Sequence, residues 1–164
     1  MRFRDDRYRD VLKAKRLEPS DIHHRTAISY PQLGRYVKER GTKGFCVPTA
    51  DTLAVIVWEL ELDANYLLET DTRYNDMSPL QAAAHMSLDR YLAVGGEAGT
   101  AAPDEIEQLR VIATEHSDPP VWAADWKRHH ESMGLTKPLS SAMPTEPSTH
   151  GSRPLSRRRR LPSR

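Results

Sequence analysis

Residues 25–40 read RTAISYPQLGRYVKER, and this stretch decides which kind of helical fold the chain is expected to form. Ser29 belongs to the residue types that favour the position before a helix, so we predict a helix over 29–39. At 3.6 residues per turn, one side of this helix is apolar. That side is formed by Leu33, Tyr36 and Val37.

The opposite side of the same helix is formed by Pro31, Arg35 and Lys38. Tyr30 and Gln32 lie on the two flanks, and Gly34 leaves the surface low beside Arg35. A short helix with one apolar side and one side of cations and amides is expected to pack inward and to contact a partner outward.

The composition places the chain among small intracellular proteins. Its 164 residues suffice for one modest domain with an appendage. The single cysteine, Cys46, excludes an internal disulfide framework and a four-cysteine zinc site. The sequence has no run of 18 apolar residues, and its first 25 residues lack the apolar stretch of a secretory signal, so no membrane partner and a cytoplasmic location are expected.

Charge is strongly segregated along the chain, although the net charge is only +1. Residues 1–45 carry 12 Lys or Arg against 6 Asp or Glu, residues 46–133 carry 5 against 16, and residues 134–164 carry 7 against 1. A polyanionic partner is therefore expected to contact the basic head or the basic tail, and to be repelled by the acidic middle.

The head has the apolar periodicity of five short helices. The first is expected over about 5–16 and the second over about 19–26, ahead of the helix at 29–39. Thr49 is expected to cap a fourth helix and Asp63 a fifth. The fourth has the clearest apolar stripe in the chain, formed by Leu53, Ile56, Val57 and Leu60.

The rest of the chain is expected to hold three more helices and a tail. Their approximate ranges are 78–94, 103–116 and 120–133. Residues 134–164 are rich in Pro, Ser, Thr and Arg, so disorder is expected there. The fold class is therefore all-α, with a head over 1–70, an acidic helical segment over 71–133 and a disordered basic tail over 134–164.

The order and spacing of the first five helices resemble the lambda-repressor-like helix-turn-helix family of the Xre, Cro and phage-repressor type, over residues 3–69. The residues that carry the resemblance are Leu17, Ile22, 26–29 (TAIS), Leu33, Pro48, Leu53, Leu60, Leu62, Leu67 and Leu68. Three positions depart from the family pattern. Pro19 replaces the usual Gln, His23 replaces a small residue, and Ala27 replaces the glycine of the turn.

The resemblance implies sequence-specific binding of double-stranded DNA by a bacterial or phage-encoded transcriptional repressor, which associates with the nucleoid when bound. The helix at 29–39 would then enter the major groove. The residues expected to contact bases are Tyr30, Pro31, Gln32 and Arg35, because Arg matches guanine and Gln matches adenine. Those expected to contact phosphates are Arg25, Ser29, Lys38 and Lys43. For each cation, the alternative is a solvated surface charge.

The sequence predicts no enzyme, no cofactor and no metal site. His23 and His24, like His129 and His130, are adjacent, so each pair diverges by about 100° on a helix, unlike the i, i+4 ligands of a helical zinc site. The carboxylates have no spacing that singles out an acid and base pair, and no glycine-rich phosphate loop is present.

Two roles remain open for the acidic segment 71–133. It is a candidate homodimerisation region, with Trp122 and Trp126 forming one aromatic ridge, or these tryptophans only bury the last helix against the fifth. The alternative function is that of an antitoxin or phage-type regulator whose C-terminal segment binds and controls a protein partner.

Overall fold

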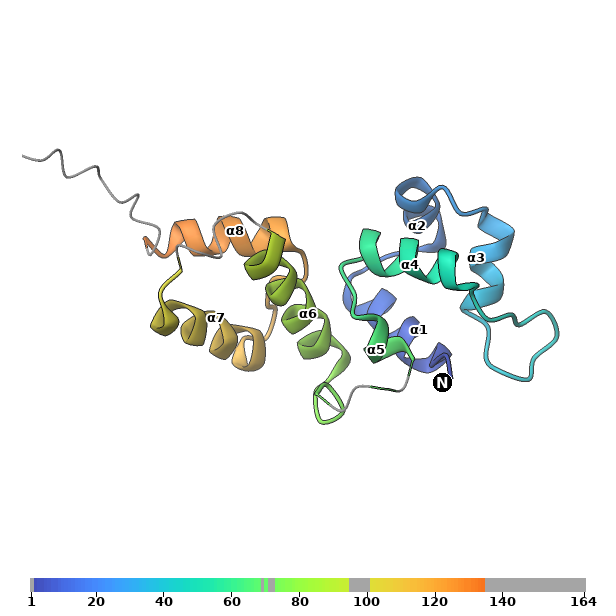
Figure 1. Ribbon diagram of the computed structural model, residues 1–164, viewed down its shortest axis with the longest axis horizontal. Coiled ribbons are helices and arrows are strands. Elements are labelled where there is room, and N and C mark those ends of the chain that lie inside the picture. The colour runs from blue at the N-terminus through green and yellow to red at the C-terminus, as the bar shows by residue number, and fades with distance from the viewer. Residues whose placement is uncertain (1, 69, 71–72, 95–100, 135–164) are drawn as a thin grey trace, which may run out of the picture.

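The computed structural model describes residues 2–68, 70, 73–94 and 101–134. Helices are the regular secondary structure of these ranges, and no strand occurs in them, so the all-α prediction is confirmed. The helices in chain order are α1 Asp5–Ala14, α2 Pro19–Thr26, α3 Tyr30–Tyr36, α4 Ala50–Glu59, α5 Ala64–Leu67, α6 Pro79–Val94, α7 Pro103–Glu115 and α8 Ala123–Ser132 (Figure 1). The predicted tail lies outside the described residues from position 135 onward.

A left-handed residue stops α1 earlier than the sequence pattern predicts. Arg16 has a φ of 56°, and its amide and that of Leu17 bond back to the carbonyls of Lys13 and Leu12, at 3.0 and 2.9 Å. These two bonds satisfy carbonyls that the end of a helix leaves free. Glu61, with a φ of 51°, ends α4 in the same way.

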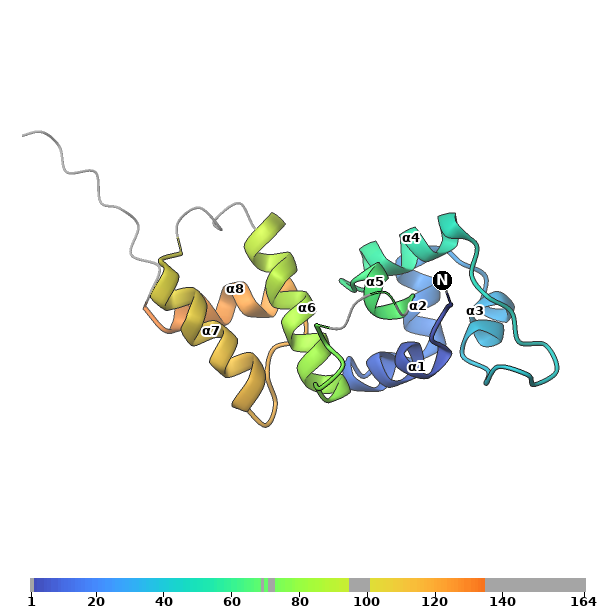
Figure 2. The ribbon, with the colours of Figure 1, turned by 60° about the horizontal axis from the view of Figure 1, so that its bottom comes forward.

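Helices α1–α5 pack around one apolar core (Figures 1 and 2). The largest side chains with no more than 1% exposure in this part are Tyr8, Val11, Ile22, Leu33, Tyr36, Ile56, Leu60 and Leu67. The stripe predicted on α4 is confirmed, since Leu53, Ile56 and Leu60 are buried and Val57 packs against the same core. Removing these side chains from water is the main stabilising contribution of the head.

Helix α6 belongs to two cores at once. Ala82 and Met86 extend the core of α1–α5, whereas Ala84, Leu88 and Tyr91 pack in a second core with α7 and α8. Both ribbon views place α6 between α1 and the pair formed by α7 and α8 (Figures 1 and 2). The first core therefore crosses the boundary predicted at residue 70.

The second core centres on Trp126, whose side chain is fully buried. Its indole N–H donates to the carbonyl of Ala84 at 3.2 Å and lies 3.0 Å from the hydroxyl oxygen of Ser87. Nearby, the Tyr91 hydroxyl and Nδ1 of the buried His130 are 2.9 Å apart. The expected tryptophan ridge is wrong, because Trp126 points into this core against α6 and α7 rather than outward or against α5.

Trp122 instead joins the start of α8 to α1 and α2. The centre of its ring system lies 4.0 Å from the ammonium nitrogen of Lys15 and 4.4 Å from the guanidinium carbon of Arg25. Lys15 is buried and donates to the carbonyl of Val121. Burial lowers the pKa of Lys15 to about 8, while the Glu61 carboxylate favours its charged form. The segment before α8 is therefore attached to the head by a desolvated cation.

The remaining predicted helix boundaries are close to the observed ones. Helix α8 begins at Ala123 rather than near residue 120, because Trp122 is extended with φ −133° and ψ 142°. Within the described ranges, every helix is too short or too polar to span a bilayer.

The turn between α2 and α3 contains a strained alanine. Ala27 has φ 57° and ψ 9°, a left-handed conformation in which a Cβ atom is unfavourable. Ala27→Gly is therefore expected to raise the free energy of unfolding by about 1 kcal/mol. Urea denaturation followed by circular dichroism measures this. The control Ala54→Gly, at an exposed position inside α4, is expected to lower stability by a similar amount. Equal destabilisation by both glycines would contradict strain at position 27.

Candidate nucleic-acid interface

Helices α2 and α3 form a packed pair joined by a three-residue connection, Ala27 to Ser29. Ile22 and Leu33 are the fully buried residues of the two helices. The Thr26 hydroxyl donates to the carbonyl of Ile22 at 2.7 Å, so the end of α2 is fixed by its own side chain.

His23 occupies the position where the resemblance expects a small residue, and it points outward. Its Nδ1 lies 2.6 Å from the carbonyl oxygen of Ile28. A carbonyl can only accept, so Nδ1 carries the proton in this arrangement. The bulkier residue is thus accommodated at the surface, where it ties α2 to the connection before α3.

Helix α3 is shorter at its C-terminal end than the sequence predicts. Ser29 occupies the N-cap position, as expected, but its hydroxyl makes no capping bond to the described residues of the helix. The helix ends at Tyr36 instead of residue 39, and Val37 is its C-cap. Lys38 follows in a loop whose Gly41 and Gly44 have φ values of 91° and 86°.

The two predicted sides of this segment are confirmed. Leu33 and Tyr36 are buried, Val37 is half-buried against the core, and Pro31, Arg35 and Lys38 are exposed. Tyr30, at the start of α3, is 55% exposed. Arg35 makes no hydrogen bond or ion pair with any described residue, so its five N–H donors face solvent.

Gly34 is half-buried and lies at the edge of the exposed side of α3, next to Arg35 in the sequence. A Cβ atom built at this position meets no atom within 4 Å, and the backbone has no positive φ. Glycine inside a helix lowers stability relative to alanine. Among the described residues, nothing in the packing requires glycine at this position.

Three of the other predicted contact residues have partners within the chain. The Gln32 amide donates to the Tyr36 hydroxyl, one turn along α3. The Lys38 ammonium group donates to the carbonyl of Lys43 at 3.1 Å and braces the following loop. Arg25 lies over Trp122, which is a role that the sequence reasoning missed. The structure thus brings Tyr30, Pro31, Gln32 and Arg35 together on α3, and it places Arg25 against the C-terminal helices.

Both Lys38 and Lys43 are nevertheless exposed, so the loop after α3 keeps two cations at the surface. A separation of five residues does not indicate a contact, so the sequence could not have predicted the hydrogen bond between Lys38 and Lys43. The i, i+4 spacing of Gln32 and Tyr36 is the usual signal for neighbours on a helix, and could have identified that pair.

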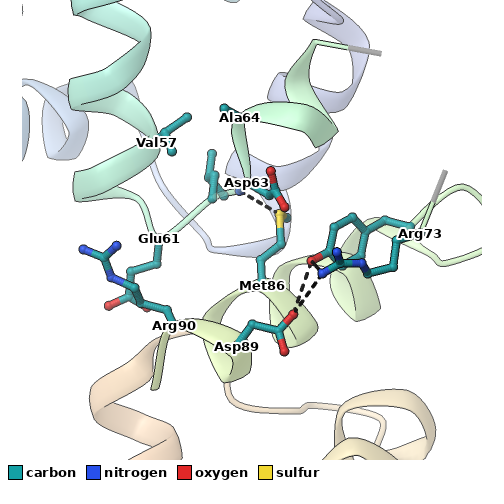
Figure 3. A pocket seen from close by; sticks show the side chains of 10 residues that line it. Val57, Glu61, Asp63, Ala64, Arg73, Met86, Asp89 and Arg90 are labelled. Atoms are coloured by element: carbon teal, nitrogen blue, oxygen red, sulfur yellow. Dashed lines mark hydrogen bonds and ion pairs between the residues drawn. The ribbon is translucent and has the colours of Figure 1, made fainter. Parts of the chain in front are cut away.

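A separate cavity of about 310 Å³ lies between the end of α4, the start of α5 and α6 (Figure 3). Arg73 lies 3.7 Å from the Asp89 carboxylate, which also pairs with Arg110 at 3.1 Å. Burial, together with Asp89, raises the pKa of Tyr74 to about 12, so its hydroxyl stays protonated. Three polar side chains of this cavity, Arg73, Tyr74 and Asp89, are engaged with one another, which suits a structural junction better than a ligand site.

The described residues contain no group of three or more His, Cys, Asp or Glu side chains placed to hold a metal ion. His85 is a buried packing residue that pairs with Thr114, and Cys46 is a half-buried free thiol. His130 is buried too and pairs with Tyr91 through Nδ1, while its Nε2 has no hydrogen-bond partner among the described residues and lies 3.8 Å from the Glu105 carboxylate.

Comparisons with family models, curated proteins and solved structures found no match to this chain.

Proposed function

We propose that the protein is a sequence-specific double-stranded DNA-binding transcriptional regulator, acting as a repressor, in which α3 enters the major groove. The observation that carries this proposal is the exposed side of α3. It presents an arginine that has no partner among the described residues, beside a glycine that their packing does not require, on a helix held to α2 by a short turn. Arg35 is suited to donate two hydrogen bonds to guanine.

The residues on either side of Arg35 also support the entry of α3 into the major groove. Tyr30 and Pro31 lie at the N-terminal end of α3, the end that a recognition helix directs at base edges. Lys38 and Lys43 lie just beyond its C-terminal end and are suited to neutralise phosphates of the groove wall. Gln32 can read adenine once its amide leaves the Tyr36 hydroxyl.

The experiment that tests the proposal is a selection of randomised duplex DNA with the purified full-length protein, followed by fluorescence anisotropy on the enriched sequence and on its scrambled version. Enrichment of one motif, bound at least about 10³-fold more tightly than the scrambled duplex, is expected of a specific regulator. Recovery of unenriched DNA, or equal affinity for both duplexes, contradicts the proposal.

Gly34→Ala is expected to have opposite effects on stability and on DNA binding. The methyl group meets open space in the free protein, so the free energy of unfolding should rise by about 0.5 to 1 kcal/mol. On the enriched duplex, the same methyl group should intrude between α3 and the DNA and weaken binding by about 1 to 3 kcal/mol.

Denaturation of the free protein and anisotropy on both duplexes measure the two effects. The scrambled duplex is the internal control, because a loosely held complex tolerates one more methyl group. Unchanged affinity for the enriched duplex would show that DNA does not approach this part of α3.

A second candidate function is the control of a protein partner by the C-terminal helices, as in antitoxins. One observation favours it: the exposed side of α7 carries Asp104, Glu107 and Glu115 around Val111, which is 43% exposed. An apolar residue within an acidic surface suits a basic protein partner. Co-purification with the product of a small adjacent reading frame tests this function, and a mixture that elutes as two separate proteins argues against it.

A further inference from the structure

Helix α4 has an apolar side that no described residue covers fully. Ala54, Val55 and Trp58 lie at i, i+1 and i+4 on its outer surface, opposite the buried Leu53, Ile56 and Leu60. Val55 is 39% exposed and Trp58 is 58% exposed. Large exposed apolar side chains that gather on one helix are typical of contact surfaces rather than of solvated ones.

A carboxylate lies at one end of this outer side, and a guanidinium group lies at the other, near the carboxylates of Glu59 and Glu61. Asp51 lies in the first turn of α4 and is exposed, on the same side as Ala54, Val55 and Trp58. At the other end, the guanidinium carbon of Arg90 lies 3.4 Å from the centre of the Trp58 ring. Figure 3 shows how Arg90 extends from α6 to the end of α4, beside Glu61. Neither Asp51 nor Arg90 has a hydrogen bond or an ion pair with a described residue.

This distribution of charge is self-complementary under a two-fold rotation. Asp51 and Trp58 are separated along the helix axis by about 10 Å, at 1.5 Å per residue. If two copies place their α4 helices antiparallel, the Asp51 end of one meets the Arg90 end of the other, and this happens twice. Ala54 at the centre lets the helices approach closely, while Val55 and Trp58 supply the apolar contact.

We propose that the outer side of α4, from Asp51 to Trp58 together with Arg90, is the homodimerisation surface of this protein. A partner of one charge sign would leave either Asp51 or Arg90 facing a like charge or none, whereas a second copy pairs Asp51 with Arg90 twice. One helix side is a small interface, below about 1,200 Å² in total, so the dimer forms at micromolar concentration and dissociates on dilution.

This surface lies in the head, and it replaces the ridge of Trp122 and Trp126 as the reason to expect a dimer. It needs no DNA, so it can be tested whether or not the protein binds DNA.

Sedimentation equilibrium of the full-length protein, from low to high micromolar concentration, tests the proposal. The average mass of the natural sequence should rise from 18.6 kDa towards twice that value. Val55→Asp should remain at 18.6 kDa across the range, because a carboxylate at the centre of the interface is buried without a partner. The matched control is Val111→Asp on α7, at a similar exposure, which should dimerise like the natural sequence.

Charge reversal distinguishes this interface from any other that contains Val55. Asp51→Arg and Arg90→Glu should each weaken the dimer about tenfold or more, since each places like charges together twice. The double variant should recover most of the affinity, because the two ends are again opposite in charge. Thermal melts of all the variants verify that each one folds.

Three results would overturn the proposal. The first is a natural sequence that stays monomeric at the highest concentration. The second is a Val55→Asp variant that dimerises as well as Val111→Asp. The third is a double charge reversal at least as weak as the weaker of the two single reversals.

Discussion

Arg35→Ala is expected to weaken binding to the preferred duplex by about 1 to 3 kcal/mol and to leave binding to a scrambled duplex nearly unchanged. The reason is the exposure of Arg35 on the outer side of α3, where its donors have no acceptor among the described residues. In a specific complex, those donors match the two acceptors of a guanine. Without that guanine in register, they add only one charge.

Fluorescence anisotropy with both duplexes at several salt concentrations measures this effect. The matched control is Lys38→Ala, which removes a cation just beyond the C-terminal end of the same helix. It should weaken both duplexes alike and make the slope of log affinity against log salt shallower by about 1. If Arg35→Ala also weakens both duplexes equally, α3 is an electrostatic surface and does not read sequence through this residue.

Trp126→Ala is expected to lower the free energy of unfolding by about 3 to 5 kcal/mol. The side chain is fully buried between α6 and α7, and its removal leaves a large cavity. The substitution also removes the indole donor that serves the carbonyl of Ala84. Because α6 contributes to both cores, the loss should destabilise the head as well as α7 and α8.

Urea denaturation of the full-length protein, followed by circular dichroism, measures this loss. Trp126→Phe is the control, since it keeps most of the apolar volume and removes the N–H group, and it should cost clearly less than alanine. A loss below about 1 kcal/mol for Trp126→Ala would mean that α8 contributes little to stability, and that the second core is not continuous with the first.

Helical periodicity determined much of the head directly from the sequence. The buried and exposed sides of α3 and the stripe of α4 agree with prediction because the direction of a helical side chain depends only on its position along the helix. Thr49 and Asp63 cap α4 and α5 as predicted, since capping is a contact between a side chain and a backbone amide two or three residues away.

Local patterns also limited these predictions. The end of α3 was placed about one turn too far, because Lys38 and the residues after it have ordinary helical propensity, and the sequence does not reveal that Lys38 will bond to Lys43. Ala27 stands where the resemblance expects the glycine of the turn, but the sequence alone does not determine its φ. The structure supplies that φ.

Only the tertiary structure decided what lies against the C-terminal helices. The sequence pairs Trp122 with Trp126 because they are four residues apart on an expected helix, yet that helix begins after Trp122. The two indoles therefore separate, one towards Lys15 and Arg25 and the other into the second core.

The exposed side of α4 depended equally on tertiary packing, since only the assembled fold determines which apolar residues of a helix stay uncovered. The sequence thus determined the sides of each helix, which local geometry controls, and the fold determined their partners, which depend on contacts between residues far apart in the chain.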